Sequence, residues 1–437
     1  MAFKNPVPSS PAADFRAKAS WVLYDWANSG YGLVVITAVF PSFFISTLLP
    51  PLPGSADPGL VVAGTELPGD AVVGLLNSVS MLLMALGAPV LGAIADIRGW
   101  AKRLLIVSAT AGSVFAMSMF FLGPGDWVRG GLLFIGSNFC FGTSFTFYNA
   151  YLPRLTRPEK QGSLSGWGFA AGYIGGAIAL ILALILIRQG KVELALAFSG
   201  AWWLAFSLPA FFFLKEFEPQ ALESGSIALA GFRRVADTFR NIRRYRVLFL
   251  FLLAYLLYND GVETVISMSP AFGTAVLGMT QDDLAMLFLL VQFIAFGGAA
   301  FFGYLADRLG DKKVIQVNLV IWIVAVGAAY LVTNQVQFFV IAGLIGIVLG
   351  GVQASSRSLM AALAPRHIHN EAFGFFSISG KFASIFGPLF YAGFATAARS
   401  HELSPRTPVL SVVPFLLLGF LVLMRVPEPR RPTAGSR

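Results

Sequence analysis

Five ionisable side chains interrupt long apolar stretches of this 437-residue chain, and they are the residues best placed to do chemistry. They are Asp25, Asp260, Glu263, Arg357 and Lys381. A charge at the centre of a membrane-spanning helix costs roughly 2.5–3.5 kcal/mol on insertion scales, so such residues usually bind something or pair with one another. A carboxylate there could take up and release a proton, and a cation could hold an anionic group.

Asp260 and Glu263 are three positions apart, so a helix would place both on one face. Asp260 lies about 14 residues into its apolar run, or ~21 Å at 1.5 Å per residue, near the middle of a bilayer. Two interpretations stay open. Either one of these carboxylates takes up a proton while Arg357 or Lys381 holds a substrate carboxylate, or Asp25, Asp260, Arg357 and Lys381 form a static ion network.

Polar and aromatic residues in the same stretches would widen a central cavity. Trp26 is favoured because it lies between Asp25 and Asn28, whereas aromatic residues in apolar helices more often serve packing. The further candidates for the cavity are Tyr148, Asn149, Tyr258, Asn259 and Gln353, with Gln292 beside them.

The composition predicts helices that cross a membrane. The chain is 56% hydrophobic and 12% charged, with a mean hydropathy of +0.73, whereas a soluble chain is roughly 25% charged. The apolar runs are continuous, which excludes the short alternating strands of a membrane barrel. Twelve helices are expected, at 18–49, 70–95, 103–122, 128–152, 163–187, 193–214, 246–277, 281–305, 313–332, 335–363, 371–397 and 407–426.

The basic residues indicate how these helices are oriented. With both termini on one side, 24 of the 31 Lys and Arg residues fall in the loops of that side and five in the loops of the other. Such a bias marks the cytoplasmic side, so we expect both termini in the cytoplasm and a location in the plasma (inner) membrane. Between the sixth and seventh helices, 215–245 is predicted to be either an amphipathic helix on the membrane surface or a solvated linker.

A block of residues recurs about 211 positions along the chain. Gly92-Ala-Ile-Ala-Asp96-Ile-Arg98-Gly99 is matched by Gly303-Tyr-Leu-Ala-Asp307-Arg308-Leu-Gly310, each where one apolar run ends and the next soon begins. At an offset of 212, one Pro and three Gly also correspond, from Pro153 with Pro365 to Gly175 with Gly387. The chain is therefore expected to be an all-α polytopic membrane protein of two pseudo-symmetric six-helix bundles, 1–214 and 246–437, joined by a cytoplasmic linker.

The two turns could act as gates. A carboxylate at Asp96 or Asp307 could accept hydrogen bonds from the start of a neighbouring helix or pair with a basic residue, and so hold one of two states. The alternative is that they are ordinary loop charges. The candidate gating residues are Gly92, Asp96, Arg98, Gly99, Gly303, Asp307, Arg308 and Gly310.

The turn motif resembles the signature of the major facilitator superfamily, and the second copy matches it better because the first has Ile97 at a basic position. More specific stretches resemble the subfamily of vacuolar amino-acid effluxers of autophagy. These stretches are Tyr24-Asp-Trp-Ala-Asn-Ser, Tyr258-Asn-Asp-Gly, Gly350-Gly-Val-Gln-Ala-Ser-Ser-Arg-Ser, Gly374-Phe-Phe and Gly380-Lys-Phe. The resemblance covers nearly the whole chain and implies a transporter fold, and it implies amino-acid export through distant eukaryotic relatives.

We therefore expect a non-enzymatic secondary transporter that moves a small solute by alternating access, coupled to a proton or another ion. The expected partners are this small-molecule substrate, the coupling ion and membrane lipid, with the chain a monomer that binds no nucleic acid. The sequence has no Gly-x-x-x-x-Gly-Lys phosphate loop and no Cys or His cluster at metal-ligand spacing, so neither a cofactor nor a metal is expected. The alternatives are a polytopic membrane enzyme acting on lipids, and a receptor or scaffold on a transporter fold.

Overall fold

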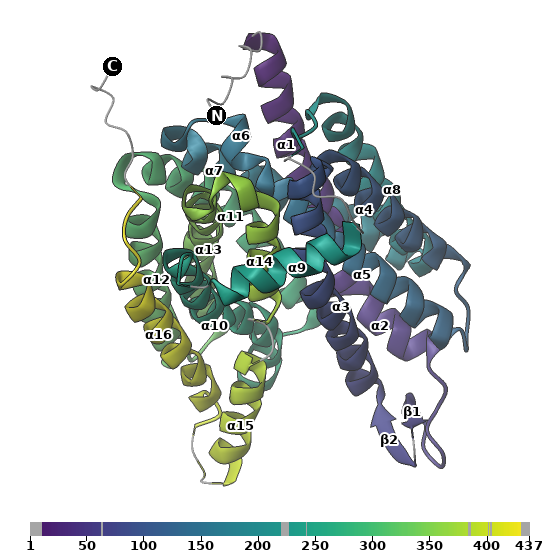
Figure 1. Cartoon of the computed structure of the whole chain (residues 1–437). Coiled ribbons are helices and arrows are strands. Elements are labelled where there is room, and N and C mark those ends of the chain that lie inside the picture. The colour runs from purple at the N-terminus through teal and green to yellow at the C-terminus, as the bar shows by residue number, and fades with distance from the viewer. Residues whose placement is uncertain are drawn as a thin grey trace.

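The computed structural model confirms an almost wholly helical membrane protein (Figure 1). It describes residues 11–62, 64–219, 227–241, 243–382, 386–400, 402 and 404–429. Within that part of the chain, eleven helical segments are long and apolar enough to cross a membrane. The expected span 128–152 is the exception. It forms a helix, α5 (Trp127–Ala150), whose Ser, Thr and Asn residues lower its mean hydropathy.

In the described part of the first half there are eight α-helices and a small hairpin. The elements are α1 (Pro11–Tyr31), η1 (Gly32–Val39), α2 (Phe40–Phe43), η2 (Phe44–Leu48), β1 (Gly59–Val62), β2 (Thr65–Pro68), α3 (Gly69–Arg98), α4 (Ala101–Ser118), η3 (Met119–Phe121), α5, α6 (Leu152–Leu155), η4 (Pro158–Lys160), α7 (Gln161–Arg188) and α8 (Val192–Phe213). The strands β1 and β2 pair antiparallel, with Gly59 opposite Pro68. The π-helical segment η1 interrupts the first span, as such segments often do near functional sites.

The second half follows the linker helix. The elements are α9 (Ile227–Arg240), α10 (Arg246–Leu277), α11 (Gln281–Leu309), α12 (Asp311–Ala329), α13 (Gln335–Leu363), η5 (Arg366–Ile368), α14 (His369–Phe382), α15 (Phe386–Ser400), η6 (Thr407–Val412) and α16 (Val413–Met424). Helices α1–α8 pack together and are called the N-half, and α10–α16 likewise form the C-half.

Local sequence sets where these helices start and stop. The Thr280 hydroxyl accepts from the backbone N–H of Asp283, and the Asp283 carboxylate accepts from the Thr280 N–H at 2.8 Å, so a capping box begins α11. Asn334 caps α13 by accepting from the N–H of Gln337 at 2.9 Å. Helix α3 ends where Gly99 takes a left-handed conformation with φ +72°, which glycine adopts at little steric cost.

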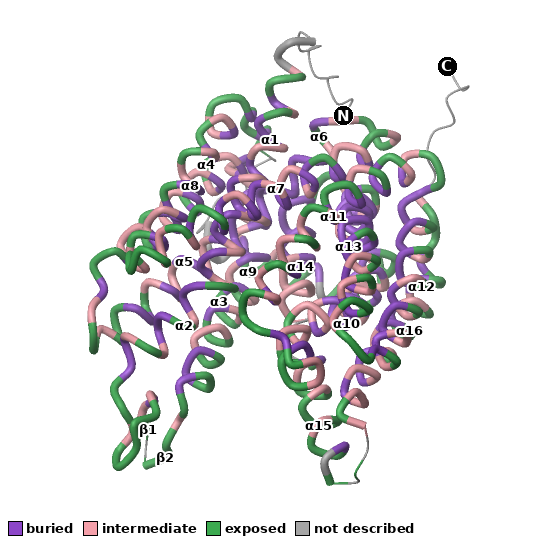
Figure 2. Tube along the Cα trace, turned by 180° about the vertical axis from the view of Figure 1, so that it is seen from behind, coloured by how far each residue is buried: buried purple, intermediate pink, exposed green. Residues whose placement is uncertain are grey.

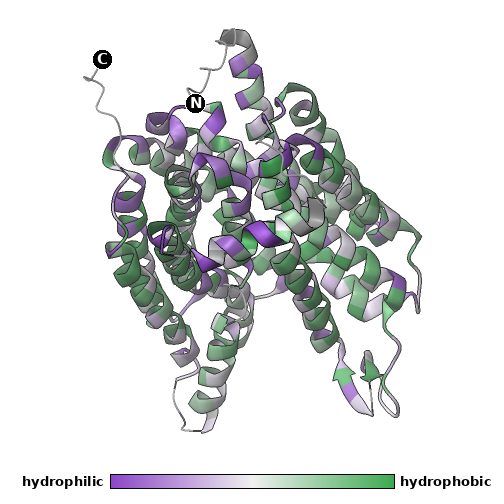
Figure 3. Ribbon diagram, viewed as in Figure 1, coloured by the Kyte–Doolittle hydropathy of each residue, from purple (hydrophilic) through white to green (hydrophobic). Residues whose placement is uncertain are grey.

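The two halves meet at one end of the molecule. The turns at Gly99 and Gly310 lie at this end, which we call the turn face. There α3 packs on α14, α5 on α14, and α7 on α11 and α13. At the opposite end, the β1–β2 hairpin and α15 lie far apart in both views (Figures 1 and 2). Hydrophobic residues line the outer helices, as expected where they contact lipid (Figure 3).

Within the linker, 227–240 forms a helix, α9, with basic residues among apolar ones, and this helix contacts both halves. Gly231 of α9 lies against Val90 and Ile94 of α3. Arg234 donates to the backbone carbonyl of His367 at 2.5 Å, and its Nε lies 3.5 Å from the Glu371 carboxylate at the start of α14. In Figure 1, α9 accordingly crosses in front of both groups of helices.

Candidate functional site

A buried ion pair joins the two halves. Arg357 of α13 donates to the Asp25 carboxylate of α1 at 2.8 Å, and both side chains are almost completely buried. The guanidinium also donates to the hydroxyl of Ser165 at 2.9 Å and to its carbonyl at 2.8 Å. Gly168 of α7 leaves room for the pair, since a Cβ there would lie 2.5 Å from the carboxylate and 2.6 Å from the guanidinium.

Aromatic and polar side chains surround this guanidinium and complete its contacts. The Arg357 carbon lies 4.7 Å from the ring centre of Trp21 and 4.1 Å from that of Phe169. The Tyr148 hydroxyl and the Asn149 amide oxygen, both on α5, accept from it at 3.4 Å. In this conformation Arg357 is committed to protein contacts, so it does not offer a free cation to a substrate carboxylate.

Asp260 has a different neighbourhood, so the four-residue ion network considered from the sequence is divided in the structure. Its carboxylate is buried and accepts from the backbone N–H of Gly387 at 3.1 Å, near the start of α15. The neighbouring Asn259 amide donates to the Gly380 carbonyl of α14 at 3.3 Å. The pair Asn259–Asp260 therefore ties α10 to both α14 and α15, and Asp260 faces these helices rather than lipid.

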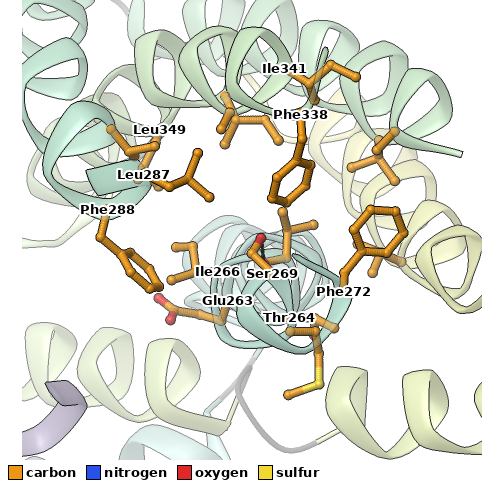
Figure 4. Close-up of a pocket in the computed structure, with 18 of the residues that line it drawn as sticks. Glu263, Thr264, Ile266, Ser269, Phe272, Leu287, Phe288, Phe338, Ile341 and Leu349 are labelled. Atoms are coloured by element: carbon orange, nitrogen blue, oxygen red, sulfur yellow. Dashed lines mark hydrogen bonds between the residues drawn. The ribbon is translucent and has the colours of Figure 1, made fainter. Parts of the chain in front are cut away.

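Glu263 faces a cavity of about 250 Å³ (Figure 4). Helices α10, α11 and α13 form most of its wall, and η1 and α7 of the N-half contribute Leu33, Thr37 and Tyr173. Apolar side chains dominate the lining, while Gln292 and Gln353 add amide groups. The Tyr173 hydroxyl donates to the Gln353 amide oxygen at 2.6 Å, which holds that amide at the boundary between the halves.

Two of the twelve cavity candidates from the sequence, Glu263 and Gln353, line this cavity. Gln292, named beside them, lines it too, whereas Tyr173 and Tyr391 were not foreseen because no motif distinguishes them from packing aromatics. The other ten candidates lie elsewhere in the structure: Asp25, Trp26, Asn28, Tyr148, Asn149, Tyr258, Asn259, Asp260, Arg357 and Lys381.

Several of these ten hold helices together. Trp26 stacks on Trp202 with ring centres 5.8 Å apart, and the Tyr258 hydroxyl lies 2.7 Å from the Ser356 hydroxyl, which links α10 to α13. Asn28 is fully buried on α1. The Lys381 ammonium lies 5.6 Å from the ring centre of Phe141, so α14 contacts α5 across the boundary.

The duplicated turns make matching contacts across the turn face. The Asp96 carboxylate of α3 accepts from the backbone N–H groups of Asn370 and Glu371 at 3.2 and 3.0 Å, and from the Asn370 amide at 2.8 Å. The Asp307 carboxylate of α11 accepts from the backbone N–H of Ser163 at 3.2 Å and from its hydroxyl. Each half thus places one carboxylate at the start of a helix in the other half, where a negative charge is favoured.

The glycines of the turns permit this contact. A Cβ at Gly92 would lie 2.5 Å from the Asn370 carbonyl, and a Cβ at Gly303 would lie 2.6 Å from the Gly162 carbonyl. The basic residues of the motif lie over aromatic rings: Arg98 lies 5.8 Å from the Trp100 ring centre and Arg308 lies 4.5 Å from that of Tyr304.

Comparisons with known proteins agree with this fold. The family described as "Vacuole effluxer Atg22 like" matches residues 15–434. The chain is 35% identical to an uncharacterized MFS-type transporter, YxiO, of Bacillus subtilis, over 94% of this chain and 95% of the relative. It is 23% identical to the autophagy-related protein 22-1 of Penicillium rubens, over 95% and 91% of the two chains.

Two solved structures share the fold at low sequence identity. The human organic anion transporter MFSD10 superposes with a TM-score of 0.72 at 14% identity, over 95% of this chain and 100% of that one. The proton:xylose symporter XylE superposes with a TM-score of 0.70 at 13% identity, over 96% and 97%.

Proposed function

This chain belongs to the Atg22-like family of major facilitator transporters, and from that membership we propose that it exports a small amphiphilic solute, such as an amino acid, in exchange for protons. It is a membrane transporter, and the substrate, direction and coupling are the parts proposed here. Efflux is suggested by the name of the matching family, and amino acids by the resemblance to autophagy effluxers noted in the sequence.

The observation that carries the proposal is the reciprocal capping of the two halves at the turn face. Asp96 binds the start of α14 and Asp307 binds the start of α7, so two hydrogen-bonded contacts of the same kind close one end. These hydrogen bonds join a carboxylate to a helix start, and water can replace both partners once the turn face opens, so the contacts can break without unfolding either half. The Asp96 and Asp307 contacts would thus act as the gate of an alternating-access cycle. The ion pair Asp25–Arg357 is a further contact that would separate when the turn face opens.

The charge bias of the loops supports a cytoplasmic location for the turn face. Both termini would then lie in the cytoplasm, and the structure would correspond to a state closed to the cytoplasm. An exporter in this state would release its substrate outside and take up protons there.

The cavity supports a small amphiphilic substrate. Its volume of about 250 Å³ is below the roughly 300–1,000 Å³ typical of drug-sized ligands, so it suits a metabolite. Its apolar wall would hold a hydrocarbon side chain, and Glu263, Gln292 and Gln353 would orient polar groups. Glu263 is also the carboxylate placed to exchange a proton with the cavity, whereas Asp260 is engaged at the start of α15.

Counterflow in proteoliposomes tests the proposal. The full chain is reconstituted with a panel of amino acids, peptides and lipids, with and without a pH gradient. We expect a neutral amino acid to exchange, and an inward proton gradient to drive its export. Asp96→Ala with Asp307→Ala serves as the comparison, because it removes the gate contacts but none of the cavity groups. Exchange of none of these compounds, with folded protein in the vesicles, would reject the proposal.

A further inference from the structure

We propose that the cavity selects apolar molecules that carry a protonated amine, and that this ammonium and a proton compete for the Glu263 carboxylate. The inference rests on the proposed function, because it assigns the substrate class and the coupling step of the same cavity. It goes further in one respect: the amine is required, and a carboxylate on the substrate is not.

The charge of the lining is the first argument. Glu263 is the one Asp, Glu, Lys, Arg or His among the lining residues in the described part of the chain. Arg357 is held by Asp25 and Ser165 and is not in the lining. The charged groups that act on Glu263 from neighbouring positions are Asp260, one turn earlier on α10, and Lys381 of α14, and neither lines the cavity. The lining itself therefore presents a single charge, which is negative, and the Lys381 ammonium that acts on it lies outside the lining.

The arrangement of the polar groups is the second argument. The Glu263 carboxylate projects from α10 toward the side where Phe288 and Ile266 lie (Figure 4). An ammonium has three N–H donors and no acceptor. Carboxylate and amide oxygens, as on Glu263, Gln292 and Gln353, can accept from it, and the charged bond to Glu263 is the strongest of these.

The apolar wall makes the charge requirement strict. Phe272, Phe338, Ile341 and Leu349 surround the rest of the cavity and offer no hydrogen bonds from their side chains (Figure 4). An ammonium entering without a carboxylate partner would be desolvated and unpaired there, which is strongly unfavourable. A substrate that carried only a carboxylate would be repelled by Glu263. The hydrocarbon part of an amine, in contrast, gains from burial against these side chains.

Competition at one carboxylate gives the coupling. When Glu263 takes a proton from the outer solution, its charge is lost and the ammonium leaves still protonated. When the cavity opens inward, the proton leaves and a cytoplasmic ammonium takes its place. One proton enters for each ammonium exported, so no net charge crosses the membrane when the substrate is a simple amine. Exchange of such an amine should follow a pH gradient and should not respond to a membrane potential. Leucine takes its carboxylate with it, so its exchange moves one positive charge inward and should respond to both.

Three compounds that share one branched hydrocarbon chain and differ in their polar group test which polar group is required. The probes are 3-methylbutylamine, which has an amine, 4-methylpentanoate, which has a carboxylate, and leucine, which has both. Thermal stabilisation of the purified chain measures binding of each, and counterflow in proteoliposomes measures movement. We expect 3-methylbutylamine and leucine to bind and exchange, and 4-methylpentanoate to do neither. As the pH is lowered through the range where Glu263 is protonated, the apparent affinity for the amine should fall about tenfold for each pH unit.

Variants assign the effect to Glu263. Glu263→Gln should weaken 3-methylbutylamine binding at least tenfold, and Glu263→Asp, which keeps the charge, should retain most of it. Glu66→Gln, which removes an exposed carboxylate from β2, is the matched control and should bind like the wild type. If Glu263→Gln fails to fold, the Asp variant and the pH series in the wild type still test the proposal.

The outcomes separate this inference from the proposed function. If 4-methylpentanoate binds as well as the amine, or if Glu263→Gln binds the amine like the wild type, the inference is overturned. Leucine exchange without amine binding would also overturn it, while leaving transport intact. Amine binding without movement of any compound would support the assigned site and reject transport through it.

Discussion

Removing the carboxylate of the Asp25–Arg357 pair should open the turn face. In Asp25→Asn the guanidinium of Arg357 remains buried and keeps its bonds to Ser165, but it loses the charge 2.8 Å away. We expect the closed conformation to lose stability relative to the open one, in which water can reach the same guanidinium.

The size of the effect follows from the geometry. At 2.8 Å and an effective dielectric constant of about 20, the attraction between two unit charges is roughly 6 kcal/mol. The amide introduced by Asp25→Asn would recover a part of it as a hydrogen-bond acceptor, and breaking one side of a buried pair typically costs about 3–5 kcal/mol. Since ~1.4 kcal/mol is a factor of ten, the ratio of open to closed protein should rise by about two to three and a half orders of magnitude.

Cysteine labelling measures this ratio. The natural Cys140 is first replaced by Ser, and Ser377→Cys then places a thiol on α14 where Ser377 accepts from the Thr146 hydroxyl of α5 at 3.2 Å. A water-soluble maleimide should react with position 377 at least 100-fold faster in Asp25→Asn, and the charge-preserving Asp25→Glu should stay within about tenfold of the parent.

A double-mutant cycle tests whether the Asp25–Arg357 pair holds the halves together. Arg357→Met alone leaves Asp25 unpaired and should also increase labelling, whereas Asp25→Asn with Arg357→Met leaves no buried charge at this position. The two substitutions should therefore couple by more than about 1 kcal/mol. Unchanged labelling in Asp25→Asn, or additive effects within ~0.5 kcal/mol, would show that the pair does not hold the halves together.

Four further substitutions test other contacts of the turn face. Asp96→Ala and Asp307→Ala each remove hydrogen bonds to a helix start, so each should weaken the closed state by about 1–3 kcal/mol, measured by the same labelling; effects confined to one half would contradict the symmetry of the gate. Gly303→Val should reduce transport in vesicles by more than tenfold, because a Cβ there meets the α7 backbone at 2.6 Å, and near-normal transport would contradict that approach. Arg234→Gln should raise hydrogen exchange across α9 about tenfold, because α9 loses its hydrogen bond to the His367 carbonyl and its ion pair with Glu371. Unchanged exchange would mean that other contacts hold the helix.

The positions of the helices could be predicted from local composition. The predicted range 335–363 coincides with α13, and 246–277 coincides with α10. Apolar length and turn residues such as Gly99 and Gly278 act within a few residues, so a window of sequence contains what sets a helix boundary. The duplicated turns were equally visible, because a repeat is a property of the sequence.

The contact partners of the charged residues could not be predicted in this way. Asp25 and Arg357 are 332 positions apart, and nothing near either residue in sequence indicates which buried charge will face it. Asp260 and Glu263 share a turn of helix, yet one contacts the start of α15 and the other faces the cavity. Such differences depend on how helices cross and on the space left between them, which is set by packing across the whole molecule. Composition and spacing therefore identify a membrane transporter, whereas the folded arrangement assigns the pair that joins the halves and the carboxylate that meets the substrate.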